Sequence, residues 1–412
     1  MNTLFGNAAV GQSGGPTAAI NATLAGVIRG FRENLHGGCI KTLYGMRNGV
    51  EGLLEERLID LGGLLSSEDR LTMLEHTPAA ALGSCRKKLP DIKKDPGFYE
   101  RLLGIFKKYD IRYFFYIGGN DSMDTVAKLS EYTGSHEYDM RIIGIPKTID
   151  NDLVGTDHTP GFGSAAKYIA TTVQEIIRDC AVYTTKAVTI VEIMGRDAGW
   201  LTASAALGRA VNGVGPDLIY LPERPFSMER FFEDLRRAHE KHPDVVVAVS
   251  EGIRYDDGRY VCEGASGRGV DVFGHKALSG TGKVLEFAVK DELGCKVRSI
   301  ELNLPQRCAA HIASAADIEE AVSVGREAVA AAAGGVTRQM MTIERVSTTP
   351  YKYRIGHADV SEIANKVRKV NPEFINDEGN NVTDACVEYL LPLIVGQTHP
   401  VFDRGIPVHI IV

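Results

Sequence analysis

Residues 113–122 read YFFYIGGNDS, an aromatic and apolar run that ends in two glycines and three small polar residues. Such a run predicts a buried β-strand, and the paired glycines indicate a tight turn at its carboxyl end. Val126 and Leu129 follow at helical spacing, so we expect a helix from about Met123. The stretch therefore predicts a strand, a glycine-rich turn and a helix, with the carboxylate of Asp121 in the turn.

The beginning of the chain has the same order of elements. Residues 8–10 are apolar, residues 11–16 read GQSGGP, and a helix with an apolar face is expected from about Thr17. Backbone N–H groups at such a turn, together with the helix dipole, can bind phosphate. The turn matches neither the Walker A pattern nor GxGxxG, so a plain strand-to-helix turn remains an alternative.

A third strand end carries charged residues. Residues 142–145 read IIGI, which is typical of a buried strand, and residues 146–152 continue as PKTIDND. In a parallel α/β sheet, ligands bind at the carboxyl ends of the strands. A carboxylate there can accept a proton from a substrate hydroxyl, and Lys147 can neutralise a phosphoryl group during its transfer. The alternative is an Asx-rich turn that only caps the next element.

The middle of the chain adds further strands. Residues 218–221 and 245–249 are nearly continuous apolar runs, typical of parallel strands buried on both faces, and Glu251 follows the second. Residues 84–88 (SCRKK) place three cations after a turn of small residues. These cations could bind an anionic ligand, or they could simply form a solvated surface. Residues 254–275, rich in glycine, aspartate and arginine, predict a surface excursion. Together the patterns predict an α/β fold with parallel sheets.

The composition limits the class of protein. The chain has 412 residues, 44% hydrophobic and 24% charged, which is typical of a globular protein with two or three lobes. Its net charge of −7 argues against binding to nucleic acids or to membrane surfaces. We find no apolar run of about 20 residues, no signal-peptide pattern and no CxxC pair among the seven cysteines. We therefore expect a cytoplasmic protein with reduced thiols and small-molecule substrates.

Four segments resemble, in this order, the phosphofructokinase family: 13–15 (SGG), 118–122 (GGNDS), 146–152 (PKTIDND) and 192–196 (EIMGR). The resemblance covers roughly residues 5–330. It implies two Rossmann-like lobes with parallel sheets flanked by helices, and an active site in the cleft between the lobes. Members of this family phosphorylate the 1-hydroxyl of fructose 6-phosphate, with either ATP or inorganic pyrophosphate as the donor.

The resemblance also implies how the chain is divided. Residues 1–150 would form the first lobe, on the donor side, and residues 151–295 the second lobe, on the sugar-phosphate side. Part of residues 296–335 would return to the first lobe. Residues 336–412 look like a C-terminal α/β extension that packs on the lobes and carries no recognisable chemistry.

Three elements are expected in this extension. Residues 340–345 and 351–355 can pair as a hairpin, and residues 359–370 begin with an N-cap sequence for a short helix. Another helix is expected from Thr383 to Pro392. Packing, a subunit contact or a cover for the active site are the roles that such an extension can have.

Two positions bear on the phosphoryl donor, because members of the family that use ATP carry glycine at the positions of Asp121 and Lys147. Asp121 would place bulk and negative charge where the α-phosphate and the nucleoside of ATP extend. Lys147 would supply a cation beside the phosphoryl group during its transfer. Together the two residues imply that the donor is inorganic pyrophosphate.

The resemblance also assigns roles to single residues. Asp150 would take the proton from the sugar 1-hydroxyl, Lys147 would stabilise the transition state, and Asp121 is grouped with them as catalytic. Pyrophosphate would bind to Gly15, Arg86, Gly119 and Lys147. Fructose 6-phosphate would bind to Thr148, Ile149, Asp150, Asp152, Met194, Gly195, Arg196, Glu251, Arg298 and Arg307. Mg²⁺ would bridge the donor phosphates, with Asn120 and Asp121 as its ligands.

Three positions depart from the family pattern. Asn120 stands where the family usually has a metal-binding aspartate, which weakens the magnesium assignment there. Residues 302–307 (LNLPQR) carry leucine where the family has a histidine or tyrosine that contacts the 6-phosphate. Ala187 replaces an arginine that many members contribute across a subunit interface, with Lys186 as a candidate substitute. We expect a homodimer or a homotetramer.

Three alternative functions remain at this point. An ATP-dependent phosphofructokinase that tolerates Asp121 would differ only in its donor. Lipid and NAD kinases share a Gly-Gly-Asp-Gly turn, but they lack counterparts of residues 148–152 and 194–196. A non-catalytic regulatory subunit of the same fold would have no physical need for the base Asp150 or for Lys147.

Overall fold

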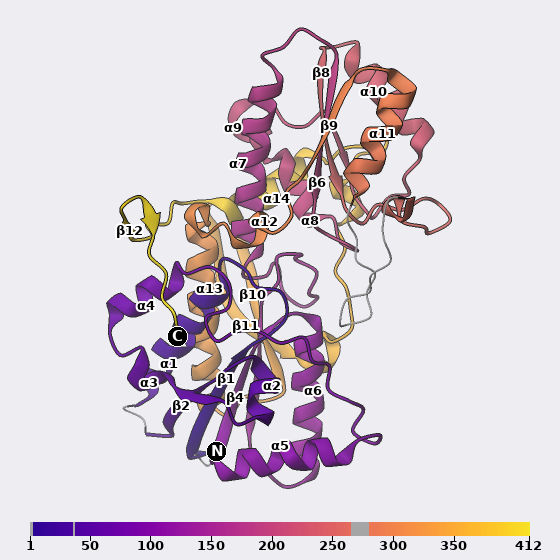
Figure 1. Cartoon of the computed structure of the whole chain (residues 1–412). Helices are drawn as coiled ribbons and strands as arrows, with labels where there is room; N and C mark the ends of the chain where they lie inside the picture. Colours follow the sequence, from indigo (N-terminus) through magenta and orange to yellow (C-terminus); the bar gives the residue numbers. More distant parts are fainter. Residues whose placement is uncertain (1–2, 36–37, 265–279) are drawn as a thin grey trace.

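The fold is built on two β-sheets (Figure 1). A computed structural model describes residues 3–35, 38–264 and 280–412. The larger sheet has seven strands in the order β11-β10-β5-β4-β1-β2-β3. Its strands are β1 (Gly6–Gln12), β2 (Ile40–Met46), β3 (Leu58–Asp60), β4 (Ile111–Gly118), β5 (Arg141–Pro146), β10 (Gln339–Thr348) and β11 (Tyr351–Asp359). The five inner strands are parallel, and only the edge strands β3 and β11 are antiparallel to their neighbours.

The smaller sheet has four parallel strands in the order β7-β8-β6-β9. They are β6 (Ala187–Ile193), β7 (Leu218–Tyr220), β8 (Asp244–Ser250) and β9 (Lys296–Glu301). The apolar runs of β6 and β8 are buried almost along their whole length, whereas β9 is a partly exposed edge strand. The predicted α/β fold with parallel sheets is therefore confirmed.

Helices flank both sheets (Figure 1). Those around the larger sheet are α1 (Ile20–Leu35), α2 (Gly49–Leu54), α3 (Leu61–Leu64), α4 (Glu68–Glu75), α5 (Pro96–Lys108), α6 (Asn120–Ser135) and α13 (Ala315–Ala333). The smaller sheet is accompanied by α7 (Phe162–Cys180), α8 (Trp200–Ala203), α9 (Arg209–Asn212), α10 (Met228–His239) and α11 (Thr281–Leu293). The remaining α-helices and strands are α12 (Pro305–Cys308), α14 (Asp384–Leu390), β12 (Phe402–Asp403) and β13 (Ile406–Pro407). Among the helices of the described ranges, none is long and apolar enough to cross a membrane.

The last third of the chain contributes to both sheets. β9 joins the smaller sheet, whereas α13 packs tightly against α1 beside the larger one. A Cβ atom on Gly26 would lie 2.1 Å from the carbonyl oxygen of Val322, and one on Gly325 would lie 2.2 Å from that of Thr23. The two helices can approach this closely only because glycine stands at both positions.

Several sequence expectations can be compared with these elements. The hairpin expected from residues 340–345 and 351–355 is confirmed as β10 and β11. The helix expected from Thr383 is confirmed as α14, which continues as a short 3-10 helix over Leu391–Ile394. The expected surface excursion at 254–275 lies outside the described residues from residue 265 onward.

Three expected helix positions need correction. The helix after β4 begins at Asn120 rather than near Met123, so Asp121 lies in its first turn. The first helix begins at Ile20 rather than near Thr17, whose hydroxyl accepts a hydrogen bond from the N–H of Ala19 at 3.2 Å. The helix expected over residues 359–370 is wrong, because only a 3-10 turn forms there, at Val360–Glu362. After that turn, residues 365–368 form hydrogen bonds with distant parts of the chain, including Asn120 and Trp200.

Candidate active site

A cavity of about 580 Å³ opens where the carboxyl ends of β1, β4 and β5 face those of β6 and β8. This is the size of an ordinary small-molecule site. Its lining includes most of the residues that the sequence predicted: Gly15, Arg86, Gly119, Asn120, Asp121, Lys147, Thr148, Ile149, Asp150, Asp152, Met194, Arg196, Glu251 and Arg307. Residues from two sheets and from distant parts of the sequence thus meet in one place.

Two of the expected residues do not line this cavity. Gly195 lies just behind its wall, where its N–H donates to Oε1 of Glu251 at 3.3 Å. Arg298 lies in the middle of β9, paired in register with Thr189, and lines separate hollows on the flank of the smaller sheet. Within one copy of the chain, the structure therefore does not bring Arg298 to the expected substrate site.

The cavity also contains residues that the sequence did not assign. Lys87 and Lys88 belong to the cation run for which a solvated face was the alternative, and both line the cavity. Asp197 lies next to an expected residue. Asn365 and Val367 come from the C-terminal extension, and no pattern in the sequence could have identified them because their neighbours there carry no motif.

Three cations surround the glycine turn after β1. Nζ of Lys147 donates to the carbonyl oxygen of Gly15 at 2.6 Å. A Cβ atom on Gly15 would lie 3.7 Å from Nη1 of Arg307 and 3.9 Å from Nη2 of Arg86. Burial lowers the pKa of the Arg307 guanidinium, and the positive charge of Arg86 lowers it further. Cations crowded around bare backbone favour a ligand with several negative charges.

Residues 147–152 follow β5 and carry the expected base, and we call them the catalytic stretch. They are enclosed by protein. Lys147 is only 2% exposed, and burial lowers its pKa to about 8 against the opposing charge of Asp150. Burial also raises the pKa of Asp150, although the charges of Lys147 and Arg196 act in the other direction. The pKa of Asp152 rises to about 7 through burial and the neighbouring charge of Asp150. A carboxylate with a raised pKa is a stronger proton acceptor, as a general base requires.

On the opposite wall, polar groups follow β6 and β8. The N–H of Met194 donates to Oε1 of Gln306 at 3.1 Å, which fixes the turn before Arg196. Nε of Arg196 is buried and has no hydrogen-bond partner among the described residues. Burial raises the pKa of Glu251 to about 8. An unpartnered guanidinium nitrogen beside a proton-holding carboxyl group suits a ligand with both a phosphate and hydroxyl groups.

The first turn of α6, directly after β4, holds the expected metal ligands. The amide of Asn120 is engaged by backbone, since its Oδ1 accepts from the N–H of Asn365 at 2.7 Å and its Nδ2 donates to the Lys366 carbonyl at 2.6 Å. Asp121 faces the cavity and forms an ion pair with Lys88 at 3.1 Å. Asp121 is therefore better placed than Asn120 to contact a metal ion.

The cavity can accept a magnesium ion that arrives with its substrate. In the described part of the chain, no group of three or more His, Cys, Asp or Glu side chains could hold a metal ion. Mg²⁺ is commonly bound by one or two carboxylates together with substrate phosphates and water. The carboxylates of Asp121, Asp150 and Asp152 line the cavity and fit that mode of binding.

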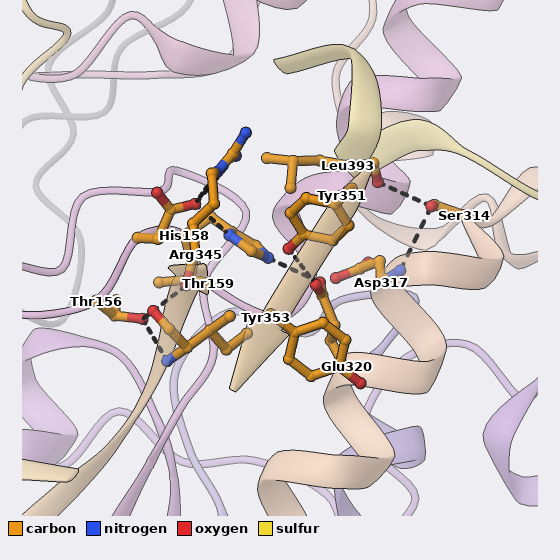
Figure 2. Close-up of polar contacts among 12 residues, drawn as sticks. Thr156, His158, Thr159, Ser314, Asp317, Glu320, Arg345, Tyr351, Tyr353 and Leu393 are labelled. Atoms are coloured by element: carbon orange, nitrogen blue, oxygen red, sulfur yellow. Dashed lines mark hydrogen bonds and ion pairs between the residues drawn. The ribbon is translucent and has the colours of Figure 1, made fainter. Parts of the chain in front are cut away.

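A buried polar network supports the chain that follows the catalytic stretch (Figure 2). His158 lies between Asp157 and Glu320, with its ring nitrogens 2.8 Å and 2.7 Å from their carboxylate oxygens. Burial opposes protonation of His158, but the charge of Glu320 and the hydrogen bond to Asp157 raise its pKa to about 9. The hydroxyl of Thr159 in turn donates to the carbonyl of Thr148 at 2.9 Å. The network therefore fixes the chain against the catalytic stretch.

Comparison with known proteins agrees with this geometry. The profile of the phosphofructokinase family matches residues 7–332. The chain is 40% identical to the pyrophosphate–fructose 6-phosphate 1-phosphotransferase of Halomonas elongata, over 97% of this chain and 94% of that protein. It is 42% identical to the protein of that name from Methylococcus capsulatus, over 97% and 94% of the two chains.

A solved structure agrees over the same length. The crystal structure of a pyrophosphate-dependent phosphofructokinase from Nitrosospira multiformis superposes with a TM-score of 0.88 and 40% sequence identity. The match covers 98% of this chain and 95% of that one, so both sheets and the C-terminal extension are included. This chain belongs to the phosphofructokinase family.

Proposed function

We propose that this protein transfers a phosphoryl group reversibly between inorganic pyrophosphate and the 1-hydroxyl of fructose 6-phosphate. The products of the forward reaction are fructose 1,6-bisphosphate and phosphate. The observation that carries the proposal is Lys147, buried at the end of β5, with its ammonium on the carbonyl of Gly15 and its charge acting on Asp150. The names of the relatives that are about 40% identical support the same reaction.

In this reaction, Asp150 accepts the proton of the sugar 1-hydroxyl as its oxygen attacks the terminal phosphorus of pyrophosphate. The bond from that phosphorus to the bridging oxygen breaks, and phosphate leaves. Lys147 is mostly protonated at neutral pH, since its pKa is about 8, and it stabilises the charge on the transferred group. Arg86 and the backbone at Gly15 and Gly119 bind pyrophosphate.

The sugar phosphate binds on the wall of the smaller sheet. Arg196 pairs with its 6-phosphate, and Glu251 and Met194 orient the sugar from the ends of β8 and β6. Thr148, Ile149, Asp152 and Gly195 shape the rest of this subsite. Arg307 was expected to bind fructose 6-phosphate, but its position beside Gly15 also lets it contact the phosphate that leaves.

Enzymes of this family generally use Mg²⁺. We propose that the ion is held chiefly by the oxygens of pyrophosphate, with Asp121 as its ligand from the protein. When bound, Mg²⁺ supplies positive charge that neutralises the donor phosphates. Asn120 serves a structural role in this proposal, because its amide is already bonded to backbone.

The position of Arg298 favours a homo-oligomer. Its side chain lies on the edge strand β9, outside the cavity of its own copy, and next to the strand that carries Ala187. We propose a homodimer or homotetramer in which Arg298 reaches the sugar 6-phosphate bound to a neighbouring copy. A cytoplasmic location fits reduced cysteines such as Cys39, Cys85, Cys180, Cys295, Cys308 and Cys386, which form no disulfide in the described chain.

The choice of donor can be tested by measuring the forward rate at saturating fructose 6-phosphate and Mg²⁺, with pyrophosphate or with ATP. We expect turnover with pyrophosphate to exceed turnover with ATP by at least about 10²-fold, because the donor end holds Asp121 and Lys147. A clear preference for ATP would contradict the proposal. Absence of turnover with both donors would instead favour a non-catalytic subunit.

A further inference from the structure

The chain after the 3-10 turn, which we call the crossing segment (residues 363–371), joins the two walls of the active-site cavity. On the side of the larger sheet, the amide of Asn120 makes two hydrogen bonds to the backbone of the segment, of 2.6 Å and 2.7 Å. On the side of the smaller sheet, the N–H of Val370 donates to Oε1 of Glu223 at 2.9 Å. The segment is therefore attached at both ends.

Arg368 lies in the middle of the crossing segment and contacts the catalytic stretch. Its backbone N–H donates to the carbonyl oxygen of Asp152 at 2.7 Å. Its Nη1 lies 3.5 Å from Oδ1 of Asn151 and also donates to the carbonyl of Asp157. One residue thus contacts both the beginning and the end of the chain between residues 151 and 157.

The backbone at this point needs external support. Asn151 is fully buried and has a φ of 55°, in the left-handed region that few non-glycine residues adopt. Such a conformation persists only where the surrounding structure holds it. Asp150 and Asp152 flank Asn151, so the direction of both carboxylates follows from this backbone. The contacts of Arg368 therefore influence where the base points.

Arg368 also contacts the opposite wall. The centre of its guanidinium lies 4.5 Å from the centroid of the Trp200 ring, and the indole N–H donates to the Arg368 carbonyl at 3.2 Å. Trp200 begins α8, four residues after Arg196 of the sugar-phosphate wall. Nη2 of Arg368 also donates to the hydroxyl of Tyr389 at 2.9 Å, which fixes the orientation of the guanidinium.

We propose that Arg368 is a positioning residue for the phosphoryl transfer. It holds the turn from Asp150 to Asp152 at a fixed position relative to Arg196 on the other side of the cavity. This inference rests on the proposed function, because Arg368 acts through the base Asp150. Arg368 does not line the cavity in the structure, so its loss should lower kcat and leave the KM of both substrates nearly unchanged.

The first test compares two arginines of similar surroundings. Arg368→Met keeps the aliphatic stem and removes the guanidinium. Arg345→Met is the matched control, since Arg345 lies 4.3 Å from the same Tyr389 ring and bonds to Asp157 at 3.0 Å. At temperatures where both variants are folded by circular dichroism, we expect kcat to fall at least about 10-fold in Arg368→Met and less than about 2-fold in Arg345→Met.

A double-mutant cycle then separates positioning from general stability. If Arg368 acts through Asp150, the double variant Asp150→Ala, Arg368→Met should turn over like Asp150→Ala alone. Losses that multiply would overturn the inference, as would a raised KM with unchanged kcat. Normal turnover of Asp150→Ala by itself would overturn the proposed function instead, so the two failures can be distinguished.

A gentler variant keeps the inference testable if Arg368→Met folds poorly. Arg368→Lys retains the charge but cannot contact Asn151 and Asp157 together while it stacks on Trp200. We expect an intermediate loss of kcat and a shift in the emission of Trp200, the single tryptophan of the chain. Wild-type kcat in Arg368→Lys together with a shifted emission would overturn the positioning role.

Discussion

The turns after the neighbouring strands β4 and β5 lie side by side at one edge of the same sheet, yet their environments differ. After β5, Lys147 is 2% exposed. Burial lowers the pKa of Lys147 and raises the pKa of Asp150, which favours the neutral form of each group. After β4, the side chain of Asp121 is 30% exposed and paired with Lys88. In the proposed reaction, burial suits the β5 turn for proton transfer, whereas the more accessible turn after β4 suits the selection of the donor.

The largest expected effect concerns the buried turn. Asp150→Ala should lower kcat by at least about 10²-fold, because the sugar hydroxyl loses its proton acceptor. Burial raises the folded pKa of Asp150 above its ordinary value of 3.8, so the ionised carboxylate costs stability at neutral pH. The variant should therefore melt at the same temperature as the wild type or higher. Near-normal turnover would refute the role of Asp150.

The second prediction concerns the cation of the same turn. Lys147→Met should lower kcat with pyrophosphate by about 10²-fold, since a charge beside the transferred group is lost. In the wild type, burial favours the neutral amine, so Lys147 is charged below its pKa of about 8 and loses its charge above it. The wild-type kcat/KM for pyrophosphate should fall as pH rises through about 8. A profile of the variant with the same fall would show that another group causes it.

The smallest expected effect concerns the accessible turn. Asp121→Gly should strengthen ATP binding several-fold, because it removes a negative charge and a side chain from the part of the cavity that binds the phosphoryl donor. Titration calorimetry with ATP measures this directly. Gains in turnover with ATP should require Lys147→Gly as well, because both positions belong to one site.

A matched control exists for this substitution. Asp124→Gly introduces the same change one turn later in α6, where Asp124 is paired with Lys128 at 2.7 Å and does not line the cavity. It should leave ATP affinity unchanged. Equal gains in both variants would indicate that a loosened helix, and not the removed charge, admits ATP.

The sequence predicted the two compared turns well because their signals are local. An apolar strand, a pair of glycines and the charged residues after them occupy adjacent positions, so residues 113–122 and 146–152 could be interpreted without the fold. The pairing of Lys88 with Asp121 could not be predicted, since a run of cations is usually solvated. The position of Arg298 was also not available, because it depends on the register of β9 against β6.

The sequence by itself therefore determined the type of sheet and the glycine turns, and it singled out Asp150 as the candidate base. All of these follow from residues close together in the chain. Only the tertiary structure decided that the crossing segment lines part of the cavity, through Asn365 and Val367. That segment forms no regular structure of its own, and its hydrogen bonds connect residues 246 and 217 positions apart. Contacts between residues so far apart leave no periodic pattern in the sequence. The position of Arg368 beside residues 151–157 could therefore be recognised only from the folded structure.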